Sequence, residues 1–279
     1  KMKTKIILFL LISVFLIIFI GVKVIAKPNT TLVPATNEKS DVSVVIPQNA
    51  VEVAPGIFSL GTVGIDGNVV EGYMIIHYKE DFTHRPGHSG DKGGKSPSCF
   101  AFLSRGAKWK TIEPWIVNTE NTRGLVDNFI FTNIADDIQK WEDASLTNIL
   151  GNGNVTIDVL SADTVNPDDK NEVYFGNIDS QGAIAVTIVW GIFSGPLSIR
   201  ELVEWDQVYD QVDFDWSSSG EAGKMDFENV ATHEIGHSVG MGHPDDSCAE
   251  ETMYRFTTFG ETKKRTLNSG DILGINELY

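Results

Sequence analysis

The pattern of apolar and polar residues divides the chain into segments of different character. Residues 6–22 are almost uninterruptedly apolar, and lysines stand before and after this run. An apolar core of about 17 residues with a basic flank is typical of an export signal or a short membrane anchor. The residues that follow are polar and aperiodic as far as residue 50. We therefore expect a signal peptide or membrane anchor over residues 1–26 and a flexible linker over 27–50. The rest would be secreted or anchored to the outer face of the membrane.

A hairpin pattern follows the linker. Apolar residues between Val51 and Tyr78 flank the turn sequence Asp66-Gly67-Asn68, which is typical of two antiparallel strands. A stretch rich in Gly, Pro and Ser follows and indicates a loop. These features predict a small β-rich N-terminal element with its loop over residues 51–97, followed by a larger domain over 98–279.

Both helical and strand periodicity occur in the larger domain. Helices are expected at residues 125–141, 227–239 and 269–278. Strands are expected at residues 109–118, 155–160, 171–178, 183–190 and 202–214, with a turn at 152–154. Strands that precede the later helices, with one early helix among them, predict an α+β domain.

Charge limits the classes of partner. The formal net charge is −16, so no basic stripe is available for a nucleic-acid backbone. Four aspartates surround one expected loop: Asp158, Asp163, Asp168 and Asp169. Such a loop can supply the oxygen ligands of Ca²⁺. A solvated acidic loop explains the same residues without an ion.

Candidate chemistry is concentrated in one short segment. It reads His233-Glu234-x-x-His237-x-x-Gly240-x-x-His243. Positions four apart share one face of a helix, and a glycine permits the sharp turn that would return His243 to the same point. Three imidazoles with one open position form the arrangement of a catalytic zinc site. Glu234, beside the first ligand, is then expected to be the general base for a zinc-activated water.

This motif, together with Met253, resembles the zinc-binding helix and Met-turn of the metzincins, and within that clan of the matrixins. Residues 271–279 are similar to the closing helix of matrixin catalytic domains, and residues 108–118 to their opening strand. The resemblance covers roughly residues 99–279. It implies a metzincin/zincin-like α+β fold: a twisted, mostly parallel five-stranded sheet with one antiparallel edge strand, an active-site helix and a C-terminal helix.

The resemblance also implies roles for single residues. Met253 would form a floor beneath the zinc, and Asp271 would anchor the Met-turn. Tyr254 would either stabilise an oxyanion or pack in the wall of the site. A peptide substrate would add to the edge strand that begins with Ala183, Ile184, Ala185 and Val186. The same apolar run also fits a buried central strand.

Three departures from the matrixin pattern bear on activation. Gly270 stands where many matrixins have a second aspartate, no cysteine-switch sequence precedes the domain, and no second, structural zinc site is visible. Cysteines of exported proteins usually pair. We therefore expect a Cys99–Cys248 disulfide rather than latency through a thiolate.

The resulting functional hypothesis is a monomeric zinc metalloendopeptidase that cleaves protein or peptide substrates and meets a membrane only through its N-terminal segment. One alternative is a zinc-binding interaction module that has lost catalysis, although the presence of Glu234 argues against it. Another is a zinc amidase that acts on a cell-wall component.

Overall fold

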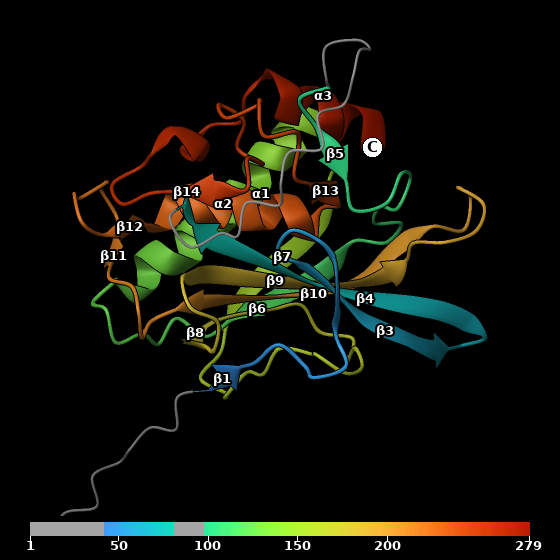
Figure 1. The fold of residues 1–279 in the computed structure, drawn as a ribbon, viewed down its shortest axis with the longest axis horizontal. Helices are drawn as coiled ribbons and strands as arrows, with labels where there is room; N and C mark the ends of the chain where they lie inside the picture. Colours follow the sequence, from blue (N-terminus) through green and yellow to red (C-terminus); the bar gives the residue numbers. More distant parts are fainter. Residues whose placement is uncertain (1–41, 81–97) are drawn as a thin grey trace, which may run out of the picture. The chain divides into compact units, whose positions relative to one another are not determined.

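One large β-sheet runs through the described part of the computed structural model, residues 42–80 and 98–279 (Figure 1). Its strand order is β2 (Val51–Ala54), β3 (Ile57–Ile65), β4 (Asn68–Lys79), β9 (Ala183–Ile192), β10 (Glu201–Asp210), β8 (Glu172–Ile178), β6 (Glu113–Val117) and β7 (Leu150–Val155). Two short strands join outside this path: β1 (Ser43–Val44) pairs with β8, and β14 (Phe256–Thr257) pairs with β4. Two further small sheets pair β11 (Trp216–Ser217) with β12 (Met225–Asp226) and β5 (Ala101–Phe102) with β13 (Met241–Gly242).

Helices cover one face of this sheet (Figure 1). They are α1 (Asp127–Ser145), α2 (Phe227–Ser238) and α3 (Ser269–Leu278), and a short 3₁₀ turn, η2, spans Lys263–Arg265. Apolar side chains of the helices and the sheet form one core, and a second core with Val44 and Leu160 lies on the other face. Because both faces of β9 are covered, all ten of its residues are buried, which explains its continuous apolar sequence.

The five-stranded core predicted from the resemblance is present. Strands β7, β6, β8 and β10 are parallel to one another, and β9 is antiparallel to β10. With α1 between two strands and α2 and α3 after them, this confirms the predicted α+β class.

The prediction that β9 is an edge strand is wrong. Strand β4 pairs antiparallel with β9, from Glu71 opposite Gly191 to Tyr78 opposite Ala183. Residues 183–186 therefore lie in a central strand. The reason is that β4 is as apolar as a core strand: Met74 and Ile75 are buried on opposite faces of the sheet.

The N-terminal element is thus continuous with the sheet of the larger domain. The predicted hairpin turn is confirmed, with φ of 49° at Asp66 and 83° at Gly67. Part of the expected linker is also a strand, since β1 lies within residues 27–50. The expected signal or anchor falls outside the described residues. Among the described residues, no helix is long and apolar enough to span a bilayer.

Two expectations in the middle of the chain are also wrong. Residues 152–154 belong to strand β7 instead of a turn, and residues 156–160 are irregular instead of a strand. Gly153 explains the first error. A Cβ at this position would lie 2.2 Å from the Trp115 ring, so the glycine serves a close contact between strands rather than a turn.

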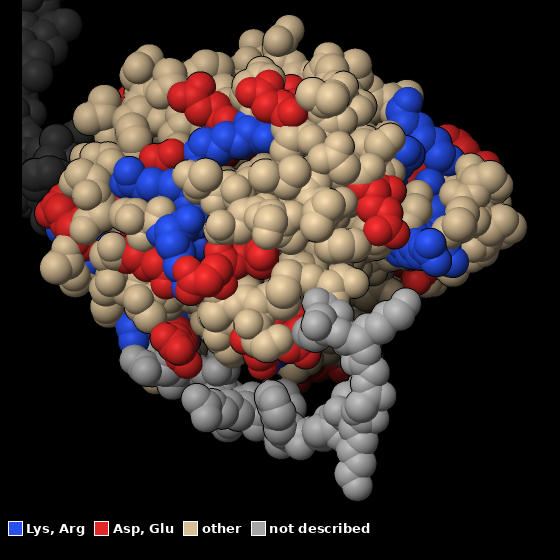
Figure 2. Space-filling view, turned by 90° about the horizontal axis from the view of Figure 1, so that it is seen from above, with Lys and Arg blue, Asp and Glu red and all other residues tan. Residues whose placement is uncertain are grey.

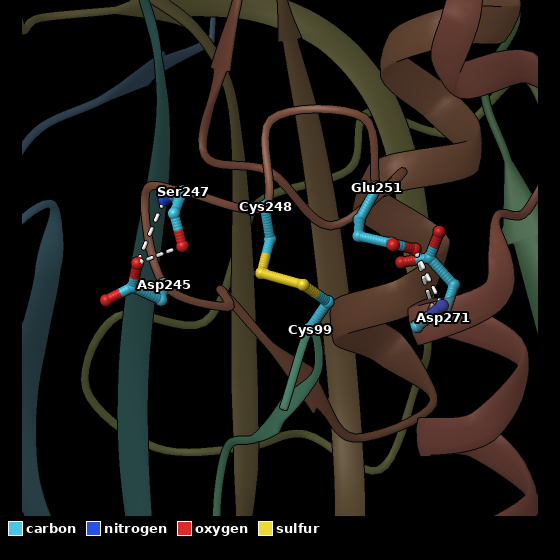
Figure 3. Close-up of a disulfide and its surroundings, with 7 residues drawn as sticks. Cys99, Asp245, Ser247, Cys248, Glu251 and Asp271 are labelled. Carbon is cyan, nitrogen blue, oxygen red and sulfur yellow. Dashed lines mark hydrogen bonds between the residues drawn. A yellow bond between two sulfur atoms is a disulfide. The ribbon is translucent and has the colours of Figure 1, made fainter. Parts of the chain in front are cut away.

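The predicted disulfide is confirmed. Figure 3 shows Cys99 joined to Cys248. Their Cα atoms are 5.4 Å apart, and the two residues are 149 positions apart in the sequence. It links the segment before β5 to the loop after His243. Gly270 contributes to this region, because a Cβ there would lie 2.1 Å from the carbonyl oxygen of Cys99.

Replacing both cysteines with serine should lower the free energy of unfolding by about 2–4 kcal/mol, since a long loop is no longer closed in the unfolded chain. Urea titration followed by tryptophan fluorescence measures this change. Wild-type protein treated with a reductant should approach the double variant, which itself should not respond. Equal unfolding midpoints for both proteins would contradict the predicted stabilisation.

Candidate metal centre

Helix α2 is fixed at both ends by specific contacts. At its start, the Asp226 side chain accepts a hydrogen bond from the Asn229 amide at 3.0 Å. At its end, Gly240 has a φ of 99°, in the region that favours glycine. A Cβ on Gly240 would also lie 3.0 Å from the Ala107 carbonyl oxygen. The chain therefore turns sharply out of the helix and brings His243 back beside it.

Three histidines converge on one point. The Nε2 atoms of His233, His237 and His243 are 3.1–3.3 Å apart in pairs. Zinc–nitrogen bonds of about 2.0–2.1 Å in tetrahedral geometry place the nitrogens about 3.3 Å apart. The three side chains therefore fit a zinc ion without rearrangement.

The opposite ring nitrogens fix the orientation of two of these imidazoles. Nδ1 of His233 lies 2.7 Å from the Thr252 carbonyl oxygen, and Nδ1 of His237 lies 2.9 Å from that of Met241. When Nδ1 donates to these carbonyls, the Nε2 lone pair points to the shared centre.

Burial keeps the three imidazoles in the neutral form that ligates a metal. It lowers the pKa of His233 and His243 well below the usual value, and that of His237 to about 4. His233 and His237 are fully buried, whereas His243 is partly exposed. A cavity of about 460 Å³ borders His243, between β4 and the segment after Met253.

Glu234 lies beside the centre and is completely buried. Its Oε1 is 2.9 Å from Nδ1 of His77, and its Oε2 accepts a hydrogen bond from the Thr187 hydroxyl at 2.5 Å. Burial raises the pKa of Glu234 to about 8, against the opposing effects of the Thr187 hydrogen bond and the Lys264 charge. Both carboxylate oxygens are thus engaged by protein groups.

His77 and Lys264 complete this buried group. The His77 ring lies 4.1 Å from the His233 ring between centroids, and its Nε2 is 3.2 Å from Nζ of Lys264. Lys264 is fully buried and donates to the Tyr254 carbonyl oxygen. Burial lowers the pKa of Lys264 to about 7. The ammonium therefore lies within the same electrostatic environment as Glu234.

Sequence reasoning missed His77, Thr187 and Lys264. His77 carries one weak signal, because it is a polar residue at an inward position of an otherwise apolar strand. Thr187 and Lys264 carry no local signal. They reach Glu234 only because β9 and the η2 turn pack around α2.

Met253 and Asp271 lie together beneath helix α2. Met253 is fully buried, and its sulfur would lie 2.2 Å from a Cβ on Gly236. Asp271 accepts hydrogen bonds from the amides of Thr252 at 2.7 Å and Met253 at 3.1 Å. The Tyr254 ring contacts Phe256 at 5.5 Å between centroids, which favours a role in the wall.

The four loop aspartates do not converge. Only Asp163 joins a carboxylate cluster, and its neighbours there are Glu204 and Asp206 of β10. Asp168 pairs instead with Lys170. Sequence analysis missed the two β10 residues because they lie far along the chain from the loop.

Comparison with known proteins agrees with this geometry. The model of the matrixin family matches residues 128–279, more than half of the chain. Metalloendoproteinase 4-MMP of Arabidopsis thaliana is 44% identical over 68 residues, which cover 24% of this chain and 18% of that protein. Matrilysin of Homo sapiens is 41% identical over 64 residues, 23% of each chain.

The matched segment thus spans about a fifth of the length of these relatives. Among solved structures, metalloproteinase-II from Bacteroides fragilis aligns over 82% of this chain and 77% of its own, at 11% identity and a TM-score of 0.34. The family match and the arrangement of the three histidines lead to one conclusion: the chain belongs to the matrixin family.

Proposed function

We propose that this protein is a zinc-dependent endopeptidase. The observation that carries the proposal is the convergence of three neutral imidazoles beside a buried glutamate. Among the described residues, no carboxylate or thiolate lies close enough to all three Nε2 atoms to act as a fourth protein ligand. Three protein ligands with one open position are the arrangement of a catalytic zinc site, whereas a structural zinc has four. Membership of the matrixin family supports the same activity.

Each protein group has a definable task. When bound, zinc polarises a carbonyl and lowers the pKa of water. The three imidazoles hold the metal, and Glu234 accepts the proton of the attacking water at a carboxylate oxygen and passes it to the leaving amine. Burial raises the pKa of Glu234 toward neutral pH, which favours a carboxyl group that must both take up and release a proton. Thr187 keeps one oxygen of this carboxylate in a fixed position.

We further propose that the protein works outside the cytoplasm on protein or peptide substrates. The Cys99–Cys248 disulfide supports an oxidising compartment. On the face shown in Figure 2, basic and acidic side chains are interspersed, and much of the surface is neutral. This supports a protein substrate better than a polyanion.

Glu234→Gln should retain zinc and reduce cleavage of a peptide library by about 10²–10⁴-fold, because the amide cannot accept the proton. Metal content is measured by atomic absorption, and cleavage by mass spectrometry of long digests with and without chelator. Glu277→Gln, an exposed change on α3, serves as the matched control and should behave as wild type.

Two outcomes would contradict the proposal. Chelator-sensitive cleavage that persists in Glu234→Gln would remove the glutamate from the mechanism. Zinc-loaded protein that cleaves no peptide but turns over cell-wall amides would favour the amidase alternative.

A further inference from the structure

One observation concerns the metal centre and rests on the proposed function. Strand β4 pairs antiparallel with β9, while its last residues Tyr78 and Lys79 pair parallel with β14 after the Met-turn. The end of β4 thus lies between β9 and the wall of the site. A peptide that binds by strand addition needs the same main-chain groups of β9. Strand β4 also lies outside the residues that match the matrixin family.

The side chain at this position engages the expected base. His77 approaches Oε1 of Glu234, stacks on His233, and contacts Lys264. Thr187 holds the other oxygen of Glu234. A general base must lie within hydrogen-bond reach of the proton that it removes, and His77 occupies a position at Oε1 of Glu234 that an attacking water could otherwise take.

We propose that the hairpin of β3 and β4 is a built-in occupant of the peptide groove, and that it holds the intact chain latent. This latency does not involve a thiolate, because both cysteines of the chain are in the disulfide. Activation requires that β4 separates from β9.

Gly72 allows a test in which no residue of the metal centre is replaced. A Cβ at this position would lie 2.7 Å from the Trp190 ring, so Gly72→Val should push β4 away from β9. Gly64→Val, on β3 of the same hairpin, is the matched control because nothing lies within 4 Å of its Cβ. Gly72→Val in the full chain should cleave a peptide library about tenfold faster than wild type or more, and should lose zinc faster to a chelator. Gly64→Val should do neither.

His77→Ala provides a second variant that keeps the strand but frees Glu234, and its cleavage rate should also rise. Slower cleavage in both variants, with melting temperatures near that of the wild type, would show that the hairpin is a permanent part of the active site and would overturn latency. Unchanged cleavage and unchanged zinc release in both variants would overturn latency as well. If Gly72→Val and His77→Ala release zinc faster but no variant cleaves peptides, the hairpin covers the metal centre of the wild type as proposed. The proposed peptidase function would then be refuted.

Discussion

Three imidazoles can share one cation only if each stays neutral and keeps a fixed orientation, and this constraint organises the centre of the molecule. Helix α2 supplies two of them one turn apart, and the positive φ of Gly240 lets the chain return with the third. Carbonyl oxygens of Thr252 and Met241 hold the outer ring nitrogens. The Met-turn and the segment after the helix are therefore part of the site although neither ligates the metal.

The burial that keeps the imidazoles neutral also means that each charged side chain around the metal centre needs a hydrogen-bond partner. Asp271 accepts amide hydrogen bonds from the Met-turn, and Glu234 is held by Thr187 and His77. Lys264 forms no ion pair with a carboxylate among the described residues. Burial lowers its pKa to about 7. An N-terminal residue, His77, therefore takes part in the electrostatic balance of a site built mostly by the C-terminal half.

The same contacts connect the two ends of the chain mechanically. Strand β4 joins the sheet beside β9, and the Cys99–Cys248 disulfide ties the start of the larger domain to the loop after the third histidine. Strand β9 lies between β4 and β10, and its Thr187 donates a hydrogen bond to Glu234. The N-terminal element contacts the same glutamate through His77.

Local sequence by itself determined the features that depend on spacing within one element. Histidines four apart on a helix share a face, a glycine after them permits a turn, and Asp66-Gly67 closes a tight hairpin; these follow from backbone geometry alone. The tertiary structure decided which segments become neighbours. A continuous apolar run fits a central strand as well as a covered edge, so residues 183–192 did not reveal that β4 lies beside them. His77 and Lys264 are 187 positions apart and meet at Glu234 only when the sheet and the Met-turn pack on α2. Gly153 was misread for the same reason: a glycine needed by a distant tryptophan ring has the same local sequence as a glycine needed by a turn.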